Sequence, residues 1–259
     1  MAVIICLFAQ VGSAQAIEPA PHRAVYEMSL QSGSGRSEVS DVSGTMLYEW
    51  QDSCDGWSLT QRTAMRLLYA TGDELDLGWN LVSWESKDGM RYRFFVRKLE
   101  NGELTEEFRG EARLDGKGEG GTAEYSLPEK RTVKLPVGTL FPSHHTFALI
   151  ERIEANERLF WATVFDGSDG EGLFDVNAVV ANRLPAESET TGTREMLKEI
   201  PSSRVHLAFF DAKATATEPE HEQTLRLYYN GVVEDLVLDF GDFEVAAKLK
   251  ELKKLAPPC

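Results

Sequence analysis

The chain has 259 residues, with 42 acidic and 27 basic side chains and a formal net charge of −15. Hydrophobic residues make up 42% of it, which is enough for a buried core and excludes a disordered chain. The acidic balance argues against a broad nucleic-acid-binding surface, because such a surface needs clustered Lys and Arg. It also disfavours docking on anionic membranes, although it is compatible with a local basic patch. The length allows one large β domain or two ordinary domains.

The amino terminus has the features of an export signal. Residues 1–16 carry no charged side chain and begin with the apolar run Ala2 to Ala9, which only Cys6 interrupts. The run leads to Ala14-Gln15-Ala16, the small-x-small pattern that signal peptidase accepts. We therefore predict a signal peptide over residues 1–16, cleaved after Ala16. The alternative is a buried N-terminal strand.

Cleavage after Ala16 would remove Cys6 and leave two cysteines, Cys54 and Cys259. An even pair in an oxidising compartment is a candidate disulfide, and the alternative is two unrelated free thiols. Cys54 lies in a turn between strand-like segments, and Cys259 is the last residue. A bridge between them would close a loop of about 200 residues and stabilise the fold by roughly 5 kcal/mol at most.

After residue 16 the chain reads as a long β meander. Strand-like segments with alternating apolar and polar residues recur about every 10 to 14 residues, a spacing typical of a sandwich or barrel. Asn101-Gly102 and Asn230-Gly231 stand between such segments, and Asn-Gly is a strong signal for a two-residue hairpin turn. About fourteen strands with few helices favour a single domain over residues 17–259. We predict a mainly β fold built on one large curled antiparallel sheet.

Two segments have helical spacing instead. Pro142-Ser143 precedes a predicted helix over His144–Ala155, with Ser143 as a candidate cap. A C-terminal helix is predicted over Phe243–Leu255, because Val245, Leu249 and Leu252 form an apolar stripe.

The search for catalytic and metal-binding motifs favours a protein that is not an enzyme. His144 and His145 are adjacent, so on a helix they point about 100° apart and cannot chelate one metal ion. The acidic turn from Asp166 to Gly172 has the wrong ligand spacing for a calcium loop. The sequence contains no Gly-x-Ser-x-Gly, Cys-x-x-Cys or His-Glu-x-x-His motif. We therefore predict no catalytic residue, metal or cofactor, and the alternative is a hydrolase whose carboxylates meet only in three dimensions.

Aromatic residues on the predicted strands suggest a binding groove. A curled sheet of this length has more concave surface than a few side chains can fill, so an apolar groove is compatible with it. The candidate groove residues are Trp79, Trp84, Phe94 and Trp161. The alternative is that these aromatics form the core.

Several short motifs resemble the cell envelope integrity EipB family. They are His22-Arg23-Ala24-x-Tyr26, Cys54-Asp55-Gly56-Trp57, Gly138-Thr139-Leu140-Phe141-Pro142-Ser143-His144, Phe165-Asp166-Gly167-Ser168, Asn230-Gly231-Val232 and the terminal Cys259. The resemblance covers nearly the whole chain after the signal, from about residue 22 to the end.

That resemblance implies a Gram-negative periplasmic protein folded as an unclosed, spiralling β-barrel, with a helix against it and a shape similar to lipoprotein carriers. It also implies a stress-related role in envelope integrity, a disulfide between Cys54 and Cys259, and association with a periplasmic tetratricopeptide-repeat protein. We expect a non-enzymatic factor that binds an apolar ligand such as a lipid or lipoprotein acyl chain. The alternative is an interaction scaffold that works with the repeat protein. No membrane-spanning segment and no nucleic-acid partner are expected.

Overall fold

The computed structural model describes residues 19–33, 37–188, 192–213 and 217–256. Within these residues there are fourteen strands, one α-helix and one short 3-10 helix. They are β1 (His22–Gly33), β2 (Val39–Asp52), β3 (Gly56–Tyr69), β4 (Glu74–Ser86), β5 (Arg91–Glu100), β6 (Glu103–Leu114), β7 (Gly121–Leu127), β8 (Arg131–Leu135), α1 (Pro142–Glu154), β9 (Leu159–Phe165), β10 (Leu173–Leu184), η1 (Gly192–Leu197), β11 (Ser202–Asp211), β12 (His221–Tyr228), β13 (Val233–Asp239) and β14 (Phe243–Lys254).

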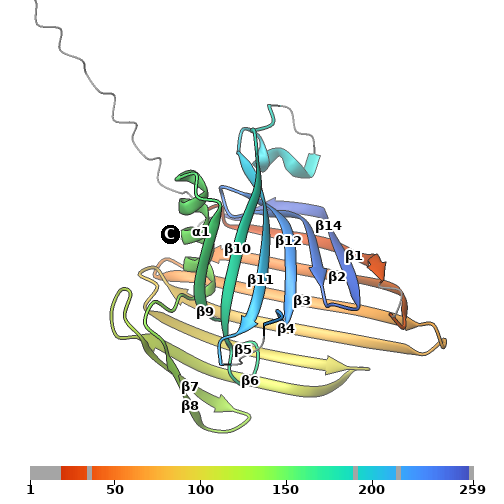
Figure 1. The fold of residues 1–259 in the computed structure, drawn as a ribbon, viewed down its shortest axis with the longest axis horizontal. Coiled ribbons are helices and arrows are strands. Elements are labelled where there is room, and N and C mark those ends of the chain that lie inside the picture. The colour runs from red at the N-terminus through yellow and green to blue at the C-terminus, as the bar shows by residue number, and fades with distance from the viewer. Residues whose placement is uncertain (1–18, 34–36, 189–191, 214–216, 257–259) are drawn as a thin grey trace, which may run out of the picture.

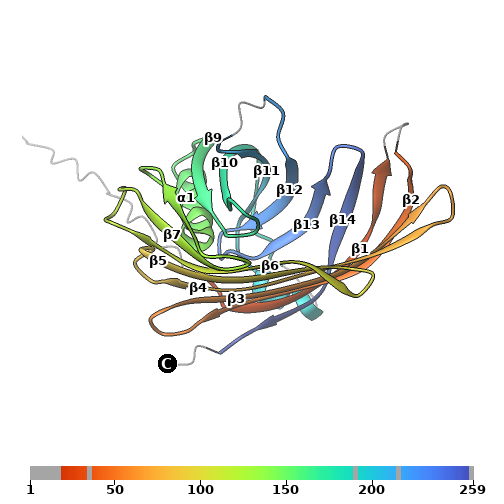
Figure 2. The same cartoon turned by 90° about the horizontal axis from the view of Figure 1, so that it is seen from below.

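All fourteen strands form one antiparallel sheet in the order β8-β7-β6-β5-β4-β3-β2-β1-β14-β13-β12-β11-β10-β9. Because β1 pairs with both β2 and β14, the consecutive strands β8 and β9 end at opposite edges. The sheet curls until β9 and β10 approach β5–β7, with α1 beside β9 (Figures 1 and 2). The prediction of one curled, unclosed antiparallel sheet is confirmed.

Period-two alternation explains why these segments form strands. In β5, Tyr92, Phe94 and Val96 are buried, whereas the alternate residues Arg91, Arg93 and Arg97 are exposed and Phe95 is partly buried. β5 turns into β6 at Asn101-Gly102, whose φ angles of 51° and 82° are the positive values that this hairpin turn requires.

The predicted C-terminal helix over Phe243–Leu255 is wrong, because this segment is strand β14. From Val245 to Leu249 every second residue is buried or partly buried, as in a strand packed on one face. Lys250 is then an extra residue in the pairing with β1, and this β-bulge delays the next buried side chain to Leu252. The bulge therefore produces the i, i+4, i+7 spacing that imitates a helix.

The predicted internal helix is present and lies along the free side of β9 (Figures 1 and 2). It begins at Pro142, a residue favoured in the first turn, and the candidate cap Ser143 lies inside the helix. Leu149, Ile150 and Ile153 form its buried face. Since an open strand edge tends to pair with other chains, α1 protects this edge of the sheet.

The turn between β9 and β10 fastens one end of the sheet to its other half. The hydroxyl of Tyr92 donates to the carbonyl of Asp166, and that of Tyr125 donates to the carbonyl of Asp169, both at 3.1 Å. Gly167 has a φ of 68°, and a Cβ on it would lie 2.5 Å from the Phe94 ring. This glycine therefore allows the turn to sit directly on the ring.

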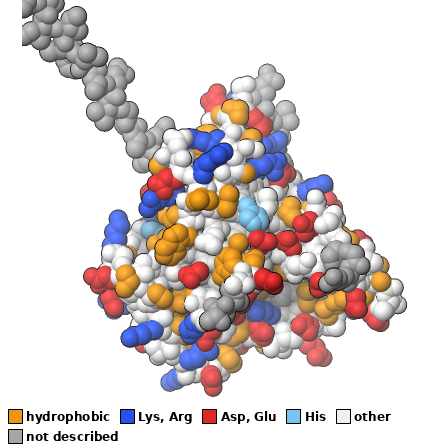
Figure 3. All heavy atoms as spheres, viewed as in Figure 1, with side chains coloured by type: hydrophobic (Ala, Val, Ile, Leu, Met, Phe, Trp, Pro, Cys, Tyr) orange, Lys and Arg blue, Asp and Glu red, His pale blue; other side chains and the backbone are white. Residues whose placement is uncertain are grey.

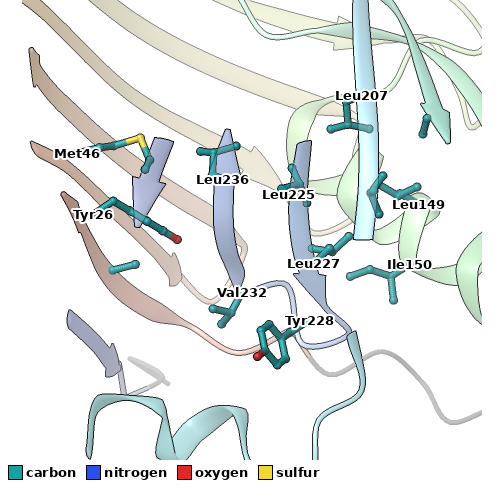
Figure 4. Packing of buried hydrophobic residues seen from close by; sticks show 14 of the residues in the cluster. Tyr26, Met46, Leu149, Ile150, Leu207, Leu225, Leu227, Tyr228, Val232 and Leu236 are labelled. Atoms are coloured by element: carbon teal, nitrogen blue, oxygen red, sulfur yellow. The ribbon is translucent and has the colours of Figure 1, made fainter. Parts of the chain in front are cut away.

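The buried hydrophobic residues form two clusters. The larger one joins β1 and β2 to α1 and β9–β14, and Figure 4 shows Leu149 and Ile150 of α1 facing Leu225 and Leu227 of β12. The second lies between β4–β8 and the residues Phe141 and Phe165, which precede α1 and end β9. Each cluster thus brings together strands that are distant in sequence.

Candidate functional site

The outer face of β3–β8, which points away from the second cluster, carries a wide hollow. Strand pairing places Trp84 beside Arg93 on this face, and it places Val82 beside Phe95, which neighbours Arg109. The hollow over these side chains has a volume of about 940 Å³ and is named the outer cleft. Its size is at the upper end of the range of ordinary ligand pockets.

The floor of the outer cleft is apolar and remains open to solvent. Val82 is 48% exposed although it lies in the middle of a central strand, and Trp84 and Phe95 beside it are half-buried. Beneath this floor, Gly110 leaves room for the ring of Phe94, because a Cβ on Gly110 would lie 2.7 Å from Phe94 Cζ. The tight packing below makes the floor a fixed surface against which an apolar group can pack.

Arginine side chains surround this floor. The guanidinium carbons of Arg93 and Arg91 lie 5.1 and 5.6 Å from the centre of the Trp84 ring, and that of Arg109 lies 4.3 Å from the centre of the Phe95 ring. These are cation–π distances. A guanidinium stacked on an aromatic ring keeps its N–H donors at the ring edge, where they can bind a carboxylate or phosphate. The outer cleft therefore combines apolar surface with guanidinium groups, and the carboxylates of Glu111 and Glu124 also belong to its lining.

Comparison with known proteins shows the family of this chain. A family model described as EipB-like matches residues 13–256. The chain belongs to the EipB-like family. Over 244 residues it is 30% identical to the cell envelope integrity protein EipB of Brucella abortus, covering 93% of this chain and 86% of that protein.

A solved EipB-like fold agrees with the curled sheet. The crystal structure of a β-barrel-like protein of domain of unknown function DUF1849 from Brucella abortus matches with a TM-score of 0.84 at 27% identity. The match covers 93% of this chain and 100% of that chain. The name of the Brucella relative refers to integrity of the cell envelope and to no catalysed reaction.

The four aromatics predicted to line a groove do not share one surface in this EipB-like sheet. Trp84 lines the outer cleft. Phe94 is 3% exposed in the second cluster, and Trp79 packs against that cluster from the inner face, with its indole N–H unpaired. Trp161 is 71% exposed on the edge strand β9. Trp84 on the floor and Phe94 beneath it therefore lie at the candidate site, whereas Trp79 and Trp161 do not.

Val82, Arg93, Phe95 and Arg109 of the outer cleft were not predicted, although the alternation of the strands indicates which of them share a face. Val82 is two residues before Trp84 and thus on the same face, and Arg93 and Phe95 share a face of the next strand. What the sequence did not provide was the pairing register, which joins these faces into one surface.

The predicted pairing of Cys54 with Cys259 stays a prediction. Cys54 lies in the turn after β2, with a φ of 69°, and is disulfide-bonded. Cys259 lies outside the described residues. The pairing places Lys254 beside His22 and His22 beside Trp50, so β14 ends near the turn that contains Cys54. The predicted signal peptide also lies outside the described residues.

The described residues offer few groups for metal or acid–base chemistry. None of their His, Cys, Asp and Glu side chains form a cluster of three that could hold a metal ion. The carboxylates of Asp166 and Asp169, in the turn once compared with a calcium loop, accept hydrogen bonds from backbone N–H groups of the same turn. Burial raises the pKa of Asp166 to about 6.

None of the described helices is long and apolar enough to span a bilayer.

Proposed function

We propose that this protein is a non-enzymatic factor of the periplasm that supports cell envelope integrity by binding an acyl chain of a lipid or lipoprotein. A signal peptide that is cleaved after Ala16 would direct its export. The observation that carries the proposal is the outer cleft, whose floor of Val82, Trp84 and Phe95 is apolar and accessible. Exposed apolar surface on a rigid, central part of a sheet is costly in water, and a bound acyl chain would cover it.

The carboxylates of the acidic turn, Asp166 and Asp169, favour a structural role over hydrolysis. Catalysis by two carboxylates requires side chains with free oxygens facing a common cleft. In the acidic turn, Asp166 Oδ1 accepts from the backbone N–H of Ser168 at 2.8 Å, and Asp169 Oδ1 accepts from that of Glu171 at 2.7 Å. These oxygens are occupied in holding the turn.

The test is binding of a monomeric lysophosphatidylcholine with a twelve-carbon chain, measured by calorimetry below its micelle concentration. Val82→Asp places a charge on the apolar floor, and we expect it to weaken binding about tenfold or more. Val137→Asp is the matched control, because Val137 is 80% exposed and lies outside the outer cleft. Absence of binding by the unmodified protein, or equal loss in both variants, would contradict the proposal.

A second surface supports the scaffold function. Leu159 and Trp161 of β9 are 72% and 71% exposed, and Val179, which pairs with Leu159, is 43% exposed. Figure 3 shows hydrophobic side chains over this region of β9 and β10. Such a patch is typical of a protein–protein contact, and we propose that a periplasmic tetratricopeptide-repeat protein docks there. Trp161→Glu should then abolish capture of the purified repeat protein, whereas Val137→Glu should not.

A further inference from the structure

A second hollow continues the outer cleft along the same face of the sheet. It has a volume of about 790 Å³ and lies over β2–β5, with Leu47, Ala64, Gly78 and Leu99 among its lining residues. Ala64 and Gly78 pair directly across two strands, so the smallest side chains lie at its centre. The two hollows occupy successive stretches of β3 and β4 on one face, each with apolar lining, and are together named the trough.

Three arginines cross the trough where the hollows meet. Arg62 on β3 lines the second hollow and Arg109 on β6 lines the outer cleft, while Arg97 on β5 lies between them. The register places Arg62 and Arg97 in one cross-strand row, on either side of Asn80, and Arg109 in the next row. These three residues are named the arginine band.

The arginine band is only partly neutralised by the protein itself. Arg97 lies 3.4 Å from Glu107, whereas neither Arg62 nor Arg109 has a carboxylate within 4 Å among the described residues. This is unusual in a chain with a net charge of −15, because carboxylates are abundant elsewhere. Residues 56–135 hold 13 basic and 14 acidic side chains, so this part of the sheet is close to neutral.

We propose that the ligand of the trough is an anionic lipid, with its phosphate or carboxylate group on the arginine band and its acyl chain in a flanking hollow. This inference rests on the proposed function, and it adds the charge of the head group and the place where that group binds. Arginine forks match the oxygens of phosphate and carboxylate groups, and two such forks have no carboxylate within 4 Å among the described residues. The apolar hollow beside the band then receives the chain that is attached to the head group.

An acidic peptide fits this surface less well. Peptides in grooves on sheets gain affinity by hydrogen bonding to free backbone groups at an edge. The floor of the outer cleft and the arginine band lie on β3–β6, which are central strands paired on both sides, so their backbone groups are used within the sheet. A lipid needs no such groups, because its chain binds through apolar contact alone.

The experiment compares lysophosphatidylglycerol with lysophosphatidylcholine, both with a twelve-carbon chain and both monomeric, at low salt. The chains are identical, so a difference in affinity reports the head group. We expect the anionic lipid to bind about tenfold more tightly than the zwitterionic lipid. Arg109→Gln should lower this affinity ratio by about three- to tenfold. Arg113→Gln is the matched control, because Arg113 is an exposed arginine of the same strand that does not line the outer cleft.

The outcomes separate this inference from the proposed function. Equal affinity for the two lipids would overturn the arginine band as a head-group site and leave acyl-chain binding intact. Binding of glycerol 3-phosphate as tightly as the anionic lipid would overturn the lipid in favour of a free anion. Failure of both lysolipids to bind would contradict the proposed function, and binding only to phosphatidylglycerol vesicles would show a membrane-docking surface instead.

Discussion

Glu85 and His144 connect the sheet to helix α1. Glu85, at the end of β4, is 1% exposed, and its Oε1 lies 2.5 Å from His144 Nδ1. The same carboxylate accepts the backbone N–H groups of Ser143 at 2.7 Å and His144 at 3.0 Å. A buried carboxylate thus satisfies the positive end of α1, which has no side-chain cap of its own.

This contact predicts a large loss of stability when Glu85 is removed. Glu85→Ala would leave two helix N–H groups and the imidazole without an acceptor, and we expect the free energy of unfolding to fall by about 2–4 kcal/mol. Urea unfolding measures the change. The control is Glu111→Ala, because the Glu111 side chain is 68% exposed and 3.7 Å from Arg93. That variant should stay within about 0.5 kcal/mol of the unmodified protein, and similar losses in both would contradict the account.

The neighbouring histidine predicts a pH dependence. His145 stacks on Phe160 at 5.8 Å, and burial lowers its pKa from 6.5 to about 4. The unfolded chain therefore binds more protons between these pH values, so the stability that neutral His145 contributes is complete above pH 6.5 and is lost as the pH falls towards 4. Between pH 7 and pH 5 this loss is about 2 kcal/mol.

The contribution of His144 to stability changes with pH in the opposite direction. Burial acts to lower its pKa, but the hydrogen bond to Glu85 and the charge of that carboxylate outweigh burial, and the pKa is raised. Its contribution is complete below pH 6.5 and is lost as the pH rises through the folded value. The measurement is therefore the difference between the unmodified protein and His145→Met. Urea unfolding at pH 7 and pH 5 should show a smaller loss in the variant, and equal losses would contradict the burial argument.

The floor of the outer cleft predicts a backbone requirement at Gly110. A Cβ there would lie 2.4 Å from the carbonyl oxygen of Glu124 and 2.7 Å from Phe94. Gly110→Ala should destabilise the protein by about 1–3 kcal/mol, because both neighbours are fixed by the sheet and the core. Gly102→Ser is the comparison, since nothing lies within 4 Å of its Cβ position and only its φ of 82° opposes the change. If Gly110→Ala lowers the free energy of unfolding no more than Gly102→Ser does, the neighbours of Gly110 can move to accept a Cβ, which would contradict the prediction.

The proposed bridge between Cys54 and Cys259 predicts a redox-dependent stability. Cys54→Ser should lower the melting temperature of the oxidised protein. The corresponding loss in the free energy of unfolding is up to about 5 kcal/mol. Reduction of the unmodified protein should give the same melting temperature as the variant. Mass spectrometry of the oxidised, protease-digested protein identifies the pair, and a peptide that joins Cys54 to any other residue would contradict it.

Local pattern was sufficient for most of the fold. Alternation predicted the sheet, Asn101-Gly102 predicted a hairpin, and the spacing after Pro142 predicted α1, because each signal lies within one segment. Strand β14 was not predicted because the bulge at Lys250 interrupts the two-residue alternation of its buried side chains. A one-residue irregularity is invisible to a pattern that is read without its pairing partner.

The candidate site was less accessible to prediction. Trp79 and Trp84 both lie on β4, but they are an odd number of residues apart and so point to opposite faces. Which of the two faces is covered depends on α1 and on the turn after β9. Both reach the inner face of the sheet only in the folded protein, so strand patterns do not indicate it. The arginine band likewise exists only because the register brings Arg62, Arg97 and Arg109 together from three strands.

The most direct test of acyl-chain binding in the outer cleft uses the indole N–H resonances of the tryptophans. The ¹⁵N-labelled protein is titrated with monomeric twelve-carbon lysophosphatidylglycerol, and each resonance is assigned with a Trp→Phe variant. The account predicts that the Trp84 resonance shifts with saturation while that of Trp79, on the inner face, stays unchanged. A titration that shifts Trp79 and leaves Trp84 in place would contradict it.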